Sequence, residues 1–574
     1  MRRATLLVCL ALVCAAAHAQ MAPRSTIQVG VWALWHDRDV TILPIARATL
    51  RACETCPGRG LGKIVVRVTN GGLIWTEESG RAHNSTVLLL TGSYRLTAHG
   101  ESLILTDPLR VTSVKGALLL VATLPVERYV ELAVAAESGT ADSPESRKAL
   151  AVVARSFALH PSHGHTGFDV CDSTHCQWVH WHTTSEAHAA TLATAGESLW
   201  VHGHRAEAYF HQNCGGRTAA ASEVWPTRSA TGHALQGSMT SRDDPYCQRA
   251  GSSEWSATLD RPELTQALAA AGLAAPGWMT LTVASRGESG RVTILLAGST
   301  KIRAEEFRLA VGRALGWNHI RSNWFEVAAD GDGFLFHGRG SGHGVGLCQA
   351  GAAEMAREGY GYREILTQYF PGTTIAEVTT GATWQTLAGQ GFTLQTSEAA
   401  DAAYVPAVGR AMTEAENRSG ITHHAAIAVR SYRSTPAFRD ATLAPGWVAA
   451  FTEGDEIAIQ PLHILAARKL LGGTLRHELL HALVEEQATA QTPLWLREGL
   501  VEAWSGDARR GPRPTLTPEL VSQKLTHATS EADSEAAHLA AGWYAQQLLD
   551  RFGRAQVMNW LRVGVPSSAL VILR

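Results

Sequence analysis

The spacing of apolar residues changes at Pro125, and this change limits most strongly what the chain can fold into. Before it lie short apolar segments, separated by Gly, Asn and Asp, such as 64–68, 86–90 and 118–121. This pattern predicts antiparallel β structure over 27–121. After it, 126–130 and 146–159 place apolar residues three and four apart, which predicts two helices. Ser143, followed by Pro144 and Glu145, is a start signal for the second helix.

The length of 574 residues corresponds to two or three domains at about 150 residues each. The hydrophobic fraction of 45% indicates globular domains, and the net charge of -2 disfavours a nucleic-acid binder. We expect an α+β chain: a β-rich domain with helices over 20–375, a linker over 376–395, and a mainly helical domain over 396–574. Thr, Gly and Ala replace the apolar runs in the linker.

The N-terminus predicts a secretory signal peptide over 1–19. Arg2 and Arg3 are basic, 4–16 is apolar, and Ala17-His18-Ala19 resembles a small-residue cleavage site. No later stretch reaches about 18 uninterrupted apolar residues, so we expect no transmembrane helix after signal removal. The predicted location is secreted, periplasmic or cell-envelope, where disulfides are permitted.

A zinc-hydrolase pattern lies near the C-terminus. His477 and His481 are four apart in an apolar-periodic helix, so both side chains can bind one Zn²⁺ with Glu478 beside them. A catalytic zinc needs a third protein ligand, and Glu498 in the following Trp-Leu-Arg-Glu-Gly-Leu segment is the candidate, with Glu502 as partner of a ligating His. Glu478 would then be the general base for hydrolysis.

These two motifs resemble those of the peptidase MA-like gluzincins over about the last 170 residues. The resemblance implies a zincin-like metallopeptidase domain with catalytic Zn²⁺, acting on an unknown peptide or protein. Tyr544 is a candidate oxyanion donor, although a packing role is the simpler interpretation.

Three segments of the first domain form another motif set. They are Leu-Pro-Val-Glu-Arg-Tyr-Val with Ala-Ala-Glu-Ser and the helix after it, Phe-Asp-Val-Cys-Asp-Ser-Thr-His-Cys-Gln-Trp, and Gly-Ser-Gly-His-Gly-Val-Gly-Leu-Cys-Gln-Ala-Gly (124–138 and 148–158, 168–178, 340–351). Together they resemble the sporulation-protein-D/amidase-enhancer (SpoIID/LytB) family over about 27–374.

That resemblance implies a lytic transglycosylase that acts on peptidoglycan glycan strands, with a preference for strands without stem peptides. Glu137 stands at the family's catalytic glutamate. The apolar residues before it predict partial burial, which would raise its pKa and keep it protonated. Lys148 and Arg155 match positions implicated around this glutamate, although they could equally be ordinary helix-surface charges. His343, in the Gly-rich loop, is a further substrate-binding candidate.

The cysteines allow both metal and disulfide interpretations. Cys171, Cys176 and His175, with His165 preferred over His163 as fourth ligand, have the residue types of a structural zinc site, which some relatives have at this segment. The alternative is a Cys171–Cys176 disulfide. We also expect disulfides between Cys53 and Cys56, and between Cys214 and Cys247.

Two functional hypotheses follow. In the first, a secreted cell-wall enzyme has a glycan-cleaving domain and a zinc peptidase domain. In the second, the first domain only binds the wall, as a targeting module or as the enhancer of a cell-wall amidase, and the C-terminal domain alone is catalytic.

Overall fold

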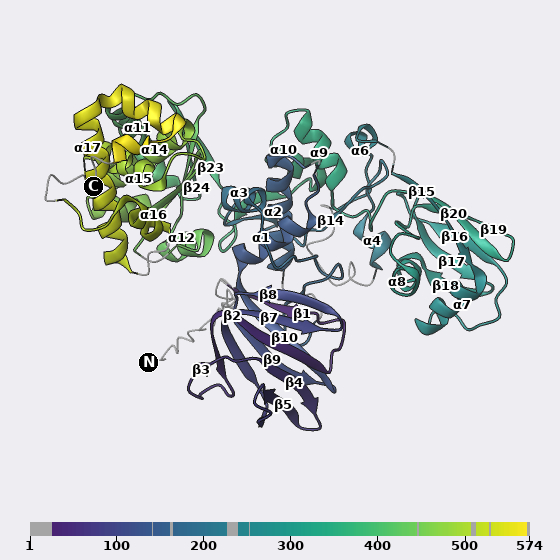
Figure 1. Ribbon diagram of the computed structural model, residues 1–574. Coiled ribbons are helices and arrows are strands. Elements are labelled where there is room, and N and C mark those ends of the chain that lie inside the picture. Colours follow the sequence, from purple (N-terminus) through teal and green to yellow (C-terminus); the bar gives the residue numbers. More distant parts are fainter. Residues whose placement is uncertain are drawn as a thin grey trace, which may run out of the picture.

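The computed structural model describes residues 26–570, except 141, 161–164, 227–238, 252, 445–446, 507–512 and 527–529. The predicted signal peptide and His163 therefore lie outside the described residues. The fold is mixed α+β, as expected. Figure 1 shows a β-rich N-terminal part below a group of central helices, with an inserted α+β module on one side and the C-terminal part on the other.

The N-terminal part is a large, mostly antiparallel sheet in the order β11-β1-β10-β9-β7-β2-β4-β5-β6, which confirms the β structure predicted over 27–121. Inward-facing residues alternate with exposed ones, as along β7. Its strands are β1 (Thr26–Val31), β2 (Asp39–Arg51), β3 (Arg59–Gly60), β4 (Ile64–Thr69), β5 (Gly72–Glu77), β6 (Ala82–Ser85), β7 (Leu88–Ala98), β8 (Glu101–Leu105), β9 (Leu109–Val114), β10 (Ala117–Pro125) and, parallel to β1, β11 (Val170–Cys171).

The two helices predicted after Pro125 are present. Ser143 caps the second and forms a capping box with Ser146. Both helices pack in the same hydrophobic core as the large sheet. The central elements are α1 (Val126–Glu137), α2 (Pro144–Ala158), α3 (Ser185–Ala193), β12 (Glu197–Val201), β13 (His204–Arg205), β14 (Phe210–His211), α4 (Ala221–Val224), α6 (Pro245–Arg249), β21 (Leu347–Cys348), α9 (Gln349–Arg357), α10 (Tyr362–Tyr369) and β22 (Thr374–Glu377).

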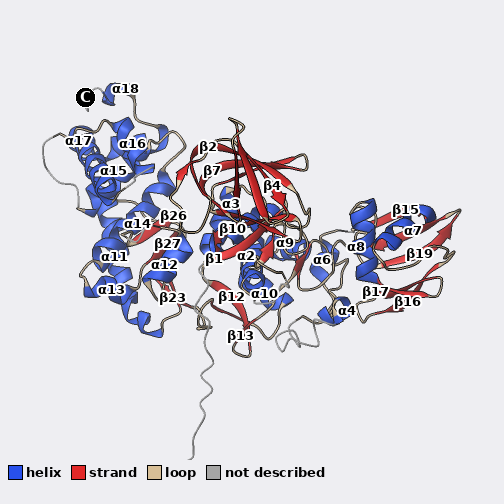
Figure 2. Ribbon diagram, turned by 90° about the horizontal axis from the view of Figure 1, so that it is seen from below, coloured by secondary structure: helices blue, strands red, loops and turns tan. Residues whose placement is uncertain are grey.

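The inserted module was not expected as a separate unit. It has its own apolar core, and its two ends meet where the Gly340 N–H donates to the Ser253 carbonyl at 3.1 Å. Figure 2 shows it at the opposite end of the molecule from the C-terminal helices. It contains β15 (Glu254–Asp260), α7 (Arg261–Ala270), β16 (Leu281–Arg286), β17 (Val292–Ala297), β18 (Thr300–Arg303), α8 (Ala304–Leu315), β19 (Phe325–Asp330) and β20 (Gly333–Arg339).

The C-terminal part is mainly helical, as expected, and it also contains a sheet, which the sequence did not predict. Its strand order is β23-β24-β25-β27-β26, and α11 provides the crossover between the parallel strands β24 and β25. The elements are β23 (Gln385–Gly389), β24 (Phe392–Thr396), η1 (Ala399–Tyr404), α11 (Val405–Ser419), β25 (Ile427–Ser431), α12 (Thr435–Thr442), β26 (Ala450–Glu453), β27 (Glu456–Ile459), α13 (Leu462–Ala467), α14 (Leu471–Gln487), α15 (Leu494–Ser505), α16 (Pro518–Thr526), α17 (Glu531–Val563) and α18 (Ser567–Leu570).

The predicted linker is largely structured. β22 pairs with β12 of the central part, whereas β23 and part of β24 fall within 376–395 and belong to the C-terminal sheet. These strands are too short for their periodicity to be recognised in the sequence.

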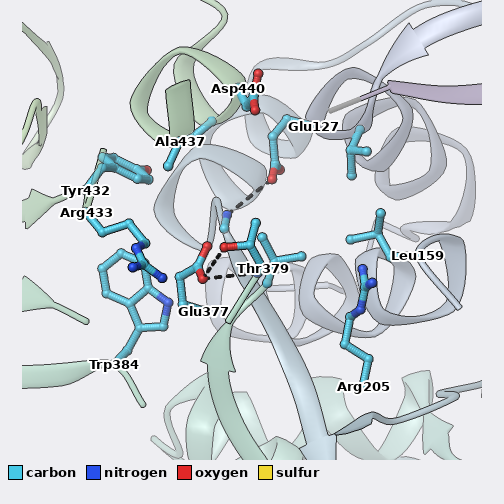
Figure 3. A pocket seen from close by; sticks show the side chains of 14 residues that line it. Glu127, Leu159, Arg205, Glu377, Thr379, Trp384, Tyr432, Arg433, Ala437 and Asp440 are labelled. Carbon is cyan, nitrogen blue, oxygen red and sulfur yellow. Dashed lines mark hydrogen bonds between the residues drawn. The ribbon is translucent and has the colours of Figure 1, made fainter. Parts of the chain in front are cut away.

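Ion pairs and a pocket connect the central and C-terminal parts. The buried Glu197 carboxylate accepts from Arg430 of the C-terminal part at 3.1 Å. It also accepts from Arg363, on α10 of the central part, at 2.7 Å. Figure 3 shows the pocket at this junction, where Glu127 and Glu377 of the central part face Tyr432 of the C-terminal part.

Candidate functional sites

Glu137 is the last residue of α1, and its carboxyl group is held beside the segment that contains Trp178. The Trp178 backbone N–H donates to Glu137 Oε1 at 2.8 Å. Upstream on α1, the Tyr129 hydroxyl donates to Gln177 Oε1 at 2.9 Å and fixes the same segment. Burial raises the pKa of Glu137 to about 7, against the opposing effect of the Trp178 hydrogen bond. The carboxyl group can therefore carry a proton near neutral pH.

Two residues beside Glu137 were not predicted as site residues. The Gln349 side-chain amide, at the start of α9, donates to the Glu137 carbonyl at 2.8 Å. The Trp178 side chain is 46% exposed and contacts His180 edge to face. Both residues belong to the quoted motifs, but only the fold shows that the motifs meet at Glu137. The residue whose backbone N–H binds the half-buried Glu137 carboxyl group therefore has an exposed indole, and an exposed indole is a suitable surface for a sugar ring.

Arg155 is placed differently from the prediction. Its side chain is fully buried and binds Glu127 on α1, at 2.6 Å between Nη2 and Oε2, and it also donates to the Glu197 carbonyl at 3.0 Å. A guanidinium with no exposed surface cannot reach a polysaccharide, so its substrate-binding role is replaced by a structural one: it joins α1, α2 and β12.

Lys148 and His343 are both engaged in other contacts. Lys148 lies 3.1 Å from Glu145 and 3.7 Å from Glu456 of the C-terminal part, so it contributes to the junction. His343 accepts from the Val345 N–H at 3.0 Å and lies against Trp225, with ring centroids 4.9 Å apart. Burial lowers the pKa of His343 to about 3, which keeps the imidazole neutral. The Gly-rich loop reaches Glu137 through Gln349.

The predicted Cys and His ligands converge. Cys171 and Cys176 are not joined by a disulfide, their sulfurs lie 3.2 Å apart, and His165 Nε2 lies 3.1 Å from Cys176 Sγ. His175 Nδ1 is 3.7 Å from Cys171 Sγ, and all four ligand atoms lie within 4.8 Å of one another. The alternative Cys171–Cys176 disulfide is not formed. Two thiols and two imidazoles at this spacing fit a tetrahedral zinc site.

The two further disulfide predictions have opposite outcomes. Cys53 and Cys56 form a disulfide, as expected. The prediction for Cys214 and Cys247 is wrong: both are buried free thiols, next to Cys348 and Asp244.

The C-terminal motif residues also meet. His477 and His481 lie one turn apart on α14, with Nε2 atoms 3.1 Å apart, and Glu498 of α15 lies 3.5 Å from His481 Nε2. Glu498 Oε2 is buried and has no hydrogen-bond partner in the described part of the chain, as suits an atom that binds a cation. Two imidazoles and a carboxylate fit three protein ligands of a catalytic zinc.

Glu478 lies beside these ligands and accepts from the Thr452 hydroxyl at 2.6 Å. Burial raises the pKa of Glu478 to about 7. His538 on α17, which the motifs did not reveal, lies 3.5 Å from Glu498 Oε2. Glu502 is buried on α15. The Tyr544 hydroxyl donates to the Leu516 carbonyl at 2.7 Å, which supports the packing role.

Known proteins resemble part of the chain. Residues 114–200 match the family model of the stage II sporulation protein SpoIID, and 234–346 match a domain of unknown function, DUF8618. The chain is 26% identical to stage II sporulation protein D of Bacillus subtilis over 50% of this chain and 84% of that protein. An uncharacterized protein of Brachyspira hyodysenteriae is 28% identical over 45% of this chain and 69% of its own length.

The chain is also 29% identical to the amidase enhancer of Bacillus subtilis, over 16% of this chain and 12% of that protein. The SpoIID match contains Glu137 and the cluster of Cys171 and Cys176, so the chain carries a SpoIID-type region around this site. These similarities indicate a cell-wall-related function. Within the described residues, no helix combines the length and apolarity needed to cross a membrane.

Proposed function

We propose that the chain is a cell-wall enzyme that works outside the cytoplasm and cleaves peptidoglycan glycan strands as a lytic transglycosylase. The observation that carries this proposal is the Glu137 carboxyl group, whose pKa burial raises to about 7 and which accepts a hydrogen bond from the backbone N–H of the exposed Trp178. The similarity to sporulation protein D and the amidase enhancer supports the cell wall as the target. The Cys53–Cys56 disulfide supports an oxidising compartment.

A single carboxyl group is sufficient for this reaction. Glu137 donates its proton to the glycosidic oxygen as the bond to the anomeric carbon breaks. The resulting carboxylate then takes the proton of the sugar's own C6 hydroxyl, whose oxygen bonds to the anomeric carbon and closes an anhydro ring. No water is consumed, so the second carboxylate of a glycoside hydrolase is not required. The Trp178 N–H would stabilise the carboxylate formed between the two steps.

We propose that the C-terminal part is a zinc peptidase. His477, His481 and Glu498 would hold the ion, which would supply Lewis-acid activation of a water molecule. Glu478 would accept the proton from that water and deliver it to the leaving amine, and Thr452 orients its carboxyl group. A second, structural zinc at Cys171, Cys176, His165 and His175 would hold the segment that carries Trp178 in place.

The central test is Glu137→Gln in the purified chain, incubated with isolated glycan strands and analysed by mass spectrometry. Since general acid catalysis contributes roughly 10²–10⁴-fold, the anhydro-muramyl product should fall by that factor. Glu186→Gln, at an exposed site on α3, is the matched control and should leave the product unchanged. Unchanged product from the Glu137 variant would refute the catalytic assignment and leave the amidase-enhancer hypothesis.

A further inference from the structure

Four buried residues from three separate segments meet at the base of the inserted module. Cys214 follows β14, Asp244 and Cys247 belong to the start of α6, and Cys348 caps α9. One ligand atom of each lies within 4.8 Å of those of the other three. The three cysteines are free thiols, and all four side chains are buried. Tetrahedral zinc, with Zn–S of about 2.3 Å, places neighbouring sulfurs about 3.8 Å apart, which agrees with this spacing.

The surrounding hydrogen bonds orient two of the four ligand residues, Cys348 and Asp244. The Cys214 N–H donates to Cys348 Sγ at 3.2 Å, and the Gly351 N–H to the same sulfur at 3.5 Å. The Tyr369 hydroxyl donates to Asp244 Oδ2 at 2.8 Å, while the Cys247 N–H donates to Asp244 Oδ1 at 2.9 Å. Donors directed at ligand atoms are the usual outer partners of a metal site.

Gly351 allows this close approach. A Cβ at this position would lie 2.0 Å from the Tyr369 hydroxyl oxygen and 2.7 Å from Asp244 Oδ2. Any larger residue would therefore displace the tyrosine that orients the carboxylate.

A buried cation lies beside the cluster. Arg291 of the inserted module is 2% exposed and donates to the carbonyls of Cys214 and Arg217, at 2.7 and 2.8 Å. The acidic groups that interact with its charge are Cys214, Glu223 and Cys348. A buried guanidinium is costly without a counter-charge. Three thiolates and a carboxylate around a divalent ion carry a net charge of about −1, which would add to the charge of Glu223.

We propose that Cys214, Asp244, Cys247 and Cys348 bind one divalent ion of the zinc class as a structural site. Thiolate ligands select a soft ion such as Zn²⁺ rather than Mg²⁺ or Ca²⁺, which prefer oxygen ligands. On binding, the three thiols lose their protons to solvent and each sulfur bonds to the ion. The ion joins the base of the inserted module to the start of α9, whose Gln349 contacts Glu137. This inference does not depend on either proposed catalytic activity.

The test uses the mature chain from Gln20 with Cys171→Ser, Cys176→Ser, His477→Ala and His481→Ala, which remove the other two clusters. Native mass spectrometry of protein produced with added zinc should show one Zn²⁺ per chain. Adding Cys247→Ser should remove it, whereas adding Cys53→Ser with Cys56→Ser, which removes the disulfide, should leave it in place.

A second measurement needs no change in the cluster. Cobalt exchanged into the four-substitution chain should give a near-ultraviolet charge-transfer band with the intensity of three thiolate bonds. A folded chain with no bound zinc, or a cobalt complex with no thiolate band, would overturn the proposal. So would a disulfide between any two of the three cysteines, detected by alkylation under non-reducing conditions.

Discussion

Glu137 and Glu478 carry carboxyl groups with similar proton affinities in different surroundings. Burial raises the pKa of each to about 7, and each accepts a hydrogen bond, from the Trp178 N–H at 2.8 Å or the Thr452 hydroxyl at 2.6 Å. Glu478 lies beside His477, His481 and Glu498, whose ligand atoms lie within 4.8 Å of one another. Glu137 lies beside an exposed tryptophan.

The comparison indicates that the carboxyl group alone does not determine the reaction. The same pKa suits a general acid for a sugar leaving group and a general base for water, because both need a group that changes protonation near neutral pH. The residues around it decide whether a cation or a sugar ring is bound next to the carboxyl group.

The largest effect should separate the two sites. Glu478→Gln should lower peptide hydrolysis by roughly 10²–10⁴-fold, because the variant cannot accept a proton, and should leave the anhydro-sugar product unchanged. Peptidoglycan and a mixture of peptides are digested together, and mass spectrometry of that digest measures both the anhydro-sugar product and the peptide fragments. If Glu478→Gln and Glu137→Gln each abolish both reactions, the two sites are not independent.

The next effect concerns the framework behind Glu137. Arg155→Met leaves the Glu127 carboxylate buried without its partner and should destabilise the chain by about 3–5 kcal/mol. Lys148→Met removes only partly exposed ion pairs, worth about 1 kcal/mol or less, and is the matched control. Urea unfolding followed by tryptophan fluorescence measures both. Equal stability of the two variants would show that Arg155 has no structural role.

The Arg155 result shows what the sequence could and could not predict. Periodicity correctly predicted α2, its Ser143 cap, and Lys148 and Arg155 on one helix, because these are local properties. It could not show that Glu127, 28 residues earlier, neutralises Arg155 inside the core. The burial of a charge depends on which distant segment packs against it.

The metal-type clusters differ in the same way. His477 and His481, four residues apart, and Cys171 and Cys176, five apart, could be recognised from their spacing, and both pairs converge as predicted. The cluster of Cys214, Cys247 and Cys348 spans 134 residues. It forms only because the chain, after completing the inserted module, comes back beside Cys214. Without that information, pairing two cysteines as a disulfide was the simpler and incorrect interpretation.

The pH dependence should give a smaller effect. Glu137 must be protonated to cleave the glycan, so the rate should fall about tenfold per pH unit once the pH exceeds about 7, where the acid form is lost. Initial rates of anhydro-sugar release between pH 5 and 9 measure this. The folded chain holds the Glu137 proton more tightly than the unfolded chain does, so the stability that this group contributes is lost as pH rises through about 7. Tryptophan fluorescence should therefore confirm that the chain stays folded at each pH. A rate independent of pH over this range would contradict the role of Glu137 as proton donor.

The smallest effect concerns the contact between the two parts that carry these carboxyl groups. His188 on α3 lies between Glu131 at 3.1 Å and Glu453 of the C-terminal part at 3.0 Å. The hydrogen bond to Glu131, followed in size by the one to Glu453, raises the pKa of His188 to about 10. The stabilising contribution of the charged imidazole is therefore complete below about pH 6.5 and is lost as pH rises through about 10. Since its side chain is 42% exposed, solvent screening limits the contribution, and His188→Gln should cost less than about 1 kcal/mol. Thermal unfolding at pH 6 and pH 10.5 tests this: the difference between wild type and variant should be present at pH 6 and absent at pH 10.5. A difference of equal size at both values would mean that packing, and not charge, accounts for the contact.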